Sequence, residues 1–128
     1  MTQAMYFPIA LCGATDQPEA ARYDRRWMVT DADGRALDGR GNDKLSAIEV
    51  RLKLGYLVMR APGMLRLDIP LDVIEDDESV FAMAKTTQGE EIQVVDEGEL
   101  AAAWISNYLQ QPARLVKIHP DEVRRDAA

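Results

Sequence analysis

The chain has 128 residues, which fits one compact domain, and 47% of them are hydrophobic, as in an ordinary globular protein. Its formal net charge is −7 and it has no basic stripe with interleaved aromatic residues, so the composition argues against nucleic-acid binding. No apolar run approaches the roughly 20 residues of a membrane span, residues 1–11 lack the basic start of a secretory signal, and the single cysteine excludes an internal disulfide; a cytoplasmic protein is expected.

The N-terminal quarter of the chain is predicted to be a strand, a loop and a second strand. Residues 4–11 form an apolar run, and Pro8 within it favours an edge strand or a bend. Residues 13–21 mix Gly, Asp, Gln and Pro, which indicates a loop. Residues 23–30 alternate in a way that suits a strand with both faces partly buried.

A hairpin is expected directly after this strand. Asp33-Gly34 is typical of a type I′ turn, which needs positive φ at both central residues. Residues 35–37 are then expected to return beside the strand, and the Gly-, Asn- and Asp-rich residues 38–44 are expected to form another loop.

Period-two alternation predicts most of the remaining strands. In residues 48–54 the apolar side chains alternate with Glu and basic side chains, which indicates a strand with one solvated face. Further strands are expected at residues 56–61, 65–69, 80–85, 91–95 and 113–118. Many short strands separated by turns favour a mainly β (α+β) fold, either a barrel or a sandwich.

One amphipathic helix is predicted near the C-terminus. Asp96 is the expected N-cap, with Glu99 three residues later as in a capping box, and the helix is expected to stop near Gln110, before Pro112. Its expected apolar stripe consists of Leu100, Trp104 and Tyr108, with Ile105 and Leu109 beside it.

Few residues offer chemistry. The only histidine, His119, is expected to be a solvated tail residue, because a zinc site usually takes four ligands at recognisable spacing. Residues 75–78 are acidic but lack the spacing of a calcium loop, so a solvated turn is expected. Cys12 has neutral neighbours, which favours a buried hydrophobe over a nucleophile. No phosphate loop or nucleophile elbow is present, so no catalytic residue is predicted.

The segment 24–29 places two arginines directly before Trp27. The planar fork of an arginine here can bind a phosphate or a carboxylate. The same arginine can instead pair with Asp24 or Asp31 at the end of a strand. The residues alone leave both interpretations open.

Several motifs follow one another in a fixed order between residues 4 and 118. They are Tyr6-Phe7-Pro8-Ile9, Asp24 to Val29 with the hairpin after it, Lys44-Leu45, Ala61-Pro62-Gly63-Met64, Leu67 to Leu71, Ala102 to Leu109 and Ala113 to Val116. In this order they resemble the N-terminal β-barrel domain of MOSC proteins, the molybdenum cofactor sulfurase C-terminal family. The resemblance implies a small β-barrel of short antiparallel strands with one C-terminal helix packed on it over residues 1–118, followed by a polar tail at 119–128.

The resemblance also implies a cofactor. In family members the barrel precedes a MOSC domain, and the two are associated with molybdenum cofactor binding, sulfur transfer, or reduction of N-hydroxylated compounds as in the mitochondrial amidoxime reducing component. The cysteine linked to molybdenum lies in the MOSC domain, which this chain is expected to lack. Arg25 matches a cofactor contact, and Cys12 matches the cysteine of a Lys-Ser-Cys motif that here reads Ala10-Leu11-Cys12. The cofactor (molybdopterin) is therefore expected to bind weakly at most, since losing charged phosphate donors costs about 1.5–3 kcal/mol each.

Three functions follow as alternatives. The first is an accessory binding module without catalytic activity of its own, whose partner is a MOSC-domain protein or a small anion near Arg25. The second is a purely structural domain. The third is a remnant of a molybdenum cofactor-binding or sulfur-transfer enzyme that uses Cys12 and Arg25. The sequence favours them in that order and leaves the ligand, the pathway and the oligomeric state open.

Overall fold

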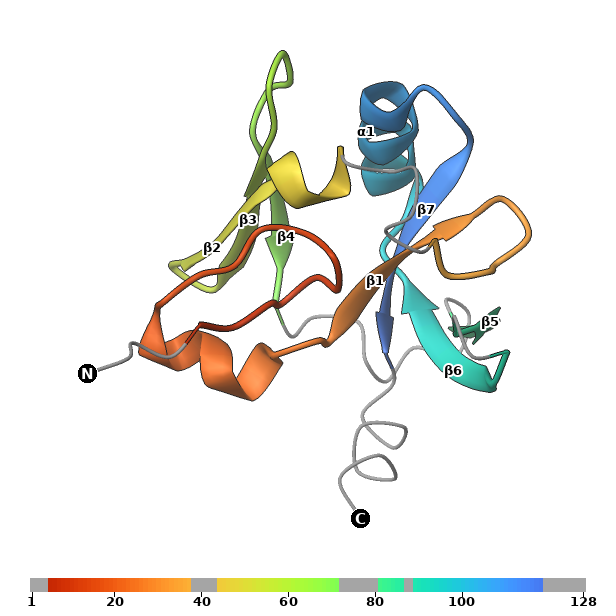
Figure 1. Ribbon diagram of the computed structural model, residues 1–128, viewed down its shortest axis with the longest axis horizontal. Coiled ribbons are helices and arrows are strands. Elements are labelled where there is room, and N and C mark those ends of the chain that lie inside the picture. Colours follow the sequence, from red (N-terminus) through yellow and green to blue (C-terminus); the bar gives the residue numbers. More distant parts are fainter. Residues whose placement is uncertain (1–4, 38–43, 72–80, 87–88, 119–128) are drawn as a thin grey trace.

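The computed structural model describes residues 5–37, 44–71, 81–86 and 89–118 and shows two antiparallel sheets with an α-helix (Figure 1). The four-stranded sheet has the order β1 (Trp27–Asp31), β7 (Ala113–Ile118), β6 (Glu91–Asp96) and β5 (Phe81–Lys85). The three-stranded sheet has the order β2 (Glu49–Lys53), β3 (Tyr56–Arg60) and β4 (Leu67–Pro70). Two short 3₁₀ helices, η1 (Pro18–Tyr23) and η2 (Leu45–Ala47), and the helix α1 (Glu99–Leu109) complete the described elements.

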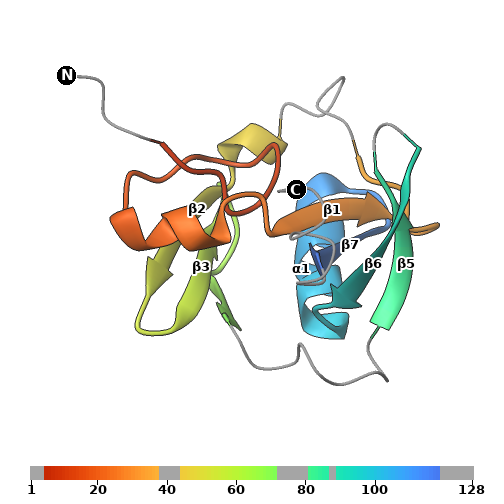
Figure 2. The same cartoon turned by 90° about the horizontal axis from the view of Figure 1, so that it is seen from below.

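The two sheets face each other across the larger of two buried hydrophobic clusters found in the described residues; the smaller cluster lies on the four-stranded sheet and consists of Met28, Ala84, Ile92, Val94 and Val116. Figure 2 shows the three-stranded sheet on one side and the four-stranded sheet with α1 on the other. Fully buried side chains come from both sheets, from α1 and from the N-terminal segment; they include Ile9, Trp27, Leu45, Ile48, Leu57, Met59, Ile105 and Leu115. The predicted fold class, a small β-barrel of short antiparallel strands with one helix packed on it, is confirmed.

The strand β2 follows the predicted alternation. Val50 and Leu52 are buried, and the charged residues between them are exposed. The prediction fails at Leu54, which is exposed because it lies in the turn to β3. Leu54 and Gly55 have φ values of 52° and 84°, the pair of positive φ angles that a type I′ turn requires.

The hairpin after β1 is confirmed, but its predicted turn type is wrong. Gly34 has a φ of 83°, whereas Asp33 is not among the residues with positive φ. Asp31 closes a three-residue loop: its carbonyl accepts from Gly34 N at 3.2 Å, and its own N–H donates to the carbonyl of Arg35 at 2.8 Å. The Asp31 carboxylate also accepts the backbone N–H groups of Asp33 and Arg35, and this local bonding favours the longer loop.

The predicted strand over residues 4–11 is wrong. Its described residues form only the isolated bridges Tyr6 to Thr15 and Ile9 to Trp27, because Pro8 has no N–H and this stretch bends at Leu11, where φ is 70°. The segment still covers an edge of the barrel.

A glutamine side chain covers the edge of the other sheet, at β2. The Gln17 amide accepts from Leu52 N at 2.7 Å and donates to Leu52 O at 2.8 Å, so it takes the place of a neighbouring strand. Residues 18–23 form the 3₁₀ helix η1, where the sequence predicted the end of a loop and the start of a strand. The strand β1 therefore begins at Trp27, later than predicted.

The helix ends as predicted but starts later. Its C-cap is Gln110, in the left-handed conformation, whereas its N-cap is Gly98 in place of Asp96. The Asp96 carboxylate accepts from Gly98 N and pairs with Arg114, Nε to Oδ2 at 2.6 Å. Burial opposes ionisation of Asp96, but the hydrogen bonds from Arg114 and Gly98 outweigh it and lower its pKa. The predicted stripe is buried except for Leu100, which lies exposed in the first turn of α1.

Some predictions lie outside the described residues. They concern His119, the tail 119–128, the acidic residues 75–78 and the boundary after 118. Within the described ranges, no helix has both the length and the apolar character needed to cross a bilayer.

Candidate functional site

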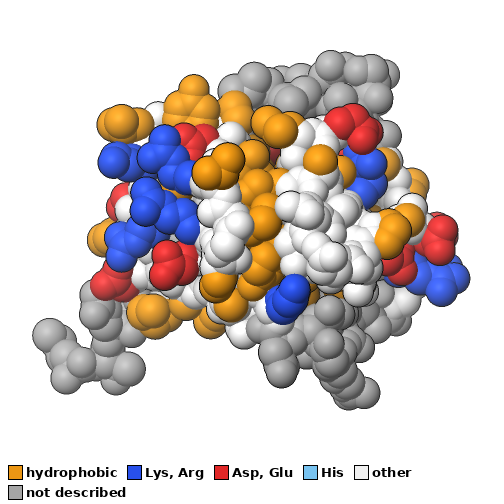
Figure 3. All heavy atoms as spheres, turned by 90° about the horizontal axis from the view of Figure 1, so that it is seen from above, with side chains coloured by type: hydrophobic (Ala, Val, Ile, Leu, Met, Phe, Trp, Pro, Cys, Tyr) orange, Lys and Arg blue, Asp and Glu red, His pale blue; other side chains and the backbone are white. Residues whose placement is uncertain are grey.

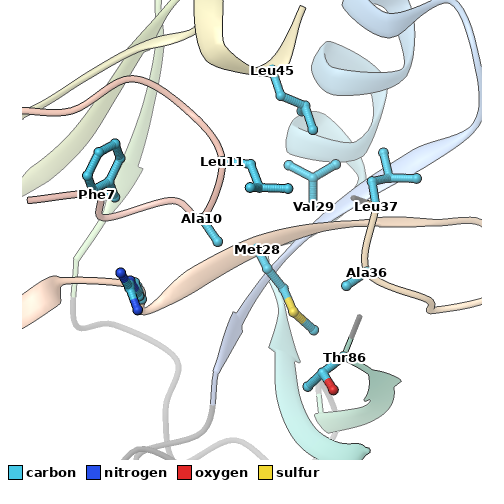
Figure 4. A pocket seen from close by; sticks show the side chains of 10 residues that line it. Phe7, Ala10, Leu11, Met28, Val29, Ala36, Leu37, Leu45 and Thr86 are labelled. Atoms are coloured by element: carbon cyan, nitrogen blue, oxygen red, sulfur yellow. The ribbon is translucent and has the colours of Figure 1, made fainter. Parts of the chain in front are cut away.

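A pocket of about 480 Å³ lies where the N-terminal segment, β1, the hairpin return and η2 meet. Of the ten described residues that line it, eight are apolar, and the other two are Arg25 and Thr86. The lining residues are Phe7, Ala10, Leu11, Arg25, Met28, Val29, Ala36, Leu37, Leu45 and Thr86. Figure 4 shows Phe7 at one end, Thr86 and Ala36 towards the other, and Leu11, Val29 and Met28 between them.

Backbone hydrogen bonds hold the N-terminal wall of the pocket against β1. Trp27 N donates to Pro8 O at 3.0 Å, and Ala10 N donates to Trp27 O at 2.9 Å. Because Trp27 is fully buried, these bonds anchor the wall to the core. The apolar side chains of Phe7 and Leu11 remain 38% and 44% exposed, so this wall presents apolar surface to solvent.

Arg25 is the charged residue among the described residues that line this pocket. Its backbone N–H donates to Phe7 O at 2.7 Å, while the carboxylate of Asp24 accepts from Phe7 N at 2.8 Å. Asp31, the other candidate partner, is engaged by N–H groups of its own hairpin. Within the described part of the chain, the Arg25 guanidinium makes no ion pair or hydrogen bond. It is therefore available to an anion.

Two side chains of the pocket are held by unfavourable backbone conformations. Leu11 and Arg25 have φ values of 70° and 57°, each at the third position of a turn closed by a backbone hydrogen bond. Gly or Asn usually occupies such a position, and another residue costs about 1–3 kcal/mol. The other two described non-glycine residues with positive φ, Leu54 and Gln110, form a hairpin turn and a helix cap, whereas these two line the pocket.

Cys12 is not part of the lining. It belongs to the core cluster, is 3% exposed, and its N–H donates to Ile9 O at 3.1 Å. Burial raises the pKa of its thiol to about 12, so the thiol is protonated at neutral pH. The structure therefore places Arg25 at the pocket and Cys12 in the core. Within the described ranges, no three His, Cys, Asp or Glu side chains could hold a metal ion together.

Cys12 is expected to resist alkylation in the folded protein. Iodoacetamide at pH 8 should modify it far more slowly than a free thiol, which has a pKa of about 8.5, because both burial and protonation protect the sulfur. In denaturant the same residue should react fully, as mass spectrometry would show. Rapid modification of the native protein at pH 8 would contradict the buried, protonated thiol.

A second cluster of charge lies on the outer face of β2 and β3. Figure 3 shows Lys and Arg side chains gathered on the side of the molecule where Figure 1 places these strands. Arg51, Lys53 and Arg60 are exposed there, and Glu49 lies opposite Arg60 in the strand register. The mixed charges indicate an ordinary solvated face, and Arg51 is a suitable control for Arg25.

The pocket residues fit only part of a molybdenum cofactor. Ala10 and Leu11 place apolar side chains where the resemblance implies Lys and Ser, and Arg25 is the one charged residue lining the pocket among those described. A phosphate group is best held by several charged or hydroxyl donors. The lining therefore does not fit the whole cofactor.

Sequence reasoning singled out Arg25 but missed Phe7 and Leu37 as lining residues, because no local pattern shows which segments of the chain meet.

Comparisons with known proteins place this geometry in a family. A family model described as "MOSC N-terminal beta barrel domain" matches residues 2–112. The chain is 29% identical to "Molybdenum cofactor sulfurase" of Danio rerio, over 97% of the chain and 16% of that protein. It is 26% identical to "Mitochondrial amidoxime-reducing component 1" of Xenopus laevis, over 97% of the chain and 39% of that protein.

A solved structure agrees with the family model. The solution structure of a Bordetella bronchiseptica protein superposes with a TM-score of 0.82 at 54% identity, covering 94% of this chain and 92% of that one. The family model spans most of the chain, and the family name describes a β-barrel, as the antiparallel sheets of this chain form. The protein therefore belongs to the MOSC N-terminal β-barrel domain family.

Proposed function

We propose that this barrel is an accessory binding module related to molybdenum cofactor proteins, without catalytic activity of its own, and that its ligand site is the Arg25 end of the pocket. The observation that carries the proposal is a guanidinium without an ion pair among the described residues, at the edge of a largely apolar cavity. Convergence of an apolar pocket and one well-placed charge is typical of small-molecule sites.

The proposal is tested by titrating the protein with molybdopterin-type cofactor and following pterin fluorescence. Because one anion contact of the family is kept, saturation is expected only at high micromolar concentration. Arg25→Ala is expected to weaken binding about ten-fold or more, since a charge-assisted hydrogen bond contributes about 1.5–3 kcal/mol. Arg51→Ala, which removes an exposed arginine on the β2 face, should leave the affinity unchanged.

Two results would count against the Arg25 site. Equal affinity of the wild type and Arg25→Ala would place cofactor binding elsewhere. The purely structural alternative would be favoured if neither the wild type nor any variant bound the cofactor while Arg25→Ala changed the unfolding midpoint.

A partner protein is a second part of the proposal. The curated relatives are several times longer than this chain, and a separate MOSC-domain protein is the partner that family membership suggests. Tagged protein expressed in its native host should co-purify with a MOSC-domain protein, identified by mass spectrometry, from the cytoplasmic fraction. Recovery of the tagged chain alone would contradict this partner.

The enzyme-remnant alternative depends on Cys12 and receives less support. Nucleophilic sulfur transfer needs an accessible thiolate, whereas Cys12 is buried and its pKa is raised to about 12. Arg25 and Cys12 would also have to act in one site, but Cys12 does not line the pocket.

A further inference from the structure

We infer that the natural ligand of the pocket is a small amphiphilic carboxylate, with an apolar body and a single negative charge. The inference rests on the proposed function, because it takes the Arg25 end of the pocket as the ligand site. It goes further by assigning a ligand class that differs from the polar, phosphate-bearing cofactor of the family.

The apolar part of the ligand follows from the lining. Phe7 and Leu11 are large apolar side chains that the fold leaves well exposed beside the pocket. Met28, Leu37 and Leu45 also line the cavity, and none of them has a charged group or a strong hydrogen-bonding group in its side chain. An apolar ligand body removes this surface from water at about 25 cal/mol per Å², whereas a polar pterin would lose its hydrogen bonds with water there.

The single charge of the ligand follows from Arg25. A planar guanidinium matches the two oxygens of a carboxylate in a bidentate pair. A phosphate dianion at the same place would keep a second negative charge that no described lining residue pairs with, and because Arg25 is exposed, solvent rather than the protein would have to balance that charge. Among the described lining residues, one cation and the Thr86 hydroxyl lie beside eight apolar residues, a lining that favours a monoanion.

The backbone fixes the turn that carries the exposed Arg25 side chain before any ligand arrives. The turn that contains Arg25 is fixed by Arg25 N to Phe7 O at 2.7 Å and Arg26 N to Tyr23 O at 3.1 Å. Arg26 Nη2 also donates to Ile118 O at 3.3 Å, which ties the turn to β7. With the turn fixed, only the Arg25 side chain has to be ordered on binding, which lowers the loss of conformational entropy.

The volume sets the size class. A cavity of about 480 Å³ lies within the roughly 300–1,000 Å³ of small-molecule pockets. A medium-chain or aryl-substituted carboxylic acid is of suitable size, and decanoate is a convenient probe.

The test follows amide chemical shifts of the ¹⁵N-labelled protein during titration with decanoate, decanol and decyl phosphate, all below their micelle concentrations. Decanoate is expected to shift residues 7–12 and 28–37 and to bind about ten-fold or more tightly than decanol. Arg25→Gln should remove that preference, and Ala36→Phe, which fills the cavity, should abolish binding. Arg51→Gln should change neither. Unfolding midpoints check that each variant is folded.

Three outcomes would overturn the inference. Equal affinity for decanol and decanoate would show that the pocket does not select an anion, and tighter binding of decyl phosphate would show a dianion site. Absence of decanoate binding would also exclude this ligand class. In each case Arg25-dependent binding of the pterin cofactor would leave the proposed function standing, whereas loss of both signals would reject the two together.

Discussion

Replacing Trp27 with alanine is expected to lower the free energy of unfolding by about 3–5 kcal/mol, the range for truncating a buried aromatic residue. Trp27 is fully buried in β1, with its ring 5.9 Å from that of Tyr23 and the buried Lys117 Nζ 5.1 Å from its centroid. Lys117 also donates to Leu71 O, so the cavity would open at a junction of both sheets. Urea unfolding, with the midpoint and slope fitted together, measures the loss.

Trp27→Phe is the matched control for this truncation. The indole Nε1 is buried and has no hydrogen-bond partner among the described residues, so phenylalanine removes an unsatisfied donor while keeping most of the apolar volume. Its loss of stability should be clearly smaller than that of Trp27→Ala. Similar losses for the two variants would show that the tryptophan is required for something other than its apolar volume.

Trp27 also connects stability to the proposed site. Its backbone hydrogen-bonds to Pro8 and Ala10, which belong to the N-terminal wall of the pocket. A cavity beneath this wall would let Phe7 and Leu11 move, and the ligand site would lose its shape before the whole domain unfolds.

Replacing Gly13 with alanine is expected to destabilise the fold by about 1–3 kcal/mol through overpacking. A Cβ atom at Gly13 would lie 2.6 Å from the carbonyl oxygen of Ile48, a contact that requires movement of backbone. The Gly13 N–H donates to the same oxygen at 2.8 Å, so the movement would break the bond that joins the N-terminal segment to the start of β2.

Native-state hydrogen exchange distinguishes this clash from a general loss of stability. The amide at position 13 should exchange faster in Gly13→Ala than the fall in global stability explains. Gly63→Ala is the control: Gly63 has a φ of 76° and no atom within 4 Å of the added Cβ, so it strains only its own turn. If Gly13→Ala keeps the wild-type unfolding midpoint and the wild-type amide exchange rate, the predicted clash with the carbonyl oxygen of Ile48 does not occur.

The sequence by itself determined the elements whose signals are local. The alternation around Val50 and Leu52 indicates a strand because one face of it meets the core, and Pro112 ends the helix because the residue before a proline avoids the helical conformation. The sequence also singled out Arg25, through its place before Trp27 and the family resemblance; the structure puts Arg25 at the pocket, and its binding role stays a prediction. These features depend on neighbours within a few residues.

Only the tertiary structure decided what the long-range contacts control. The side chain of Asp96 caps no helix because Arg114, a neighbour only after folding, binds its carboxylate. The stretch before Gly13 is no regular strand because it bends at Leu11, and backbone bonds to Trp27 and Ile48 hold it in that shape. The pocket brings together Phe7, Arg25, Leu45 and Thr86 from four separate segments. Periodicity reports which face of an element is buried, but not which elements share that burial, so a site assembled from separate segments emerges only when the chain is folded.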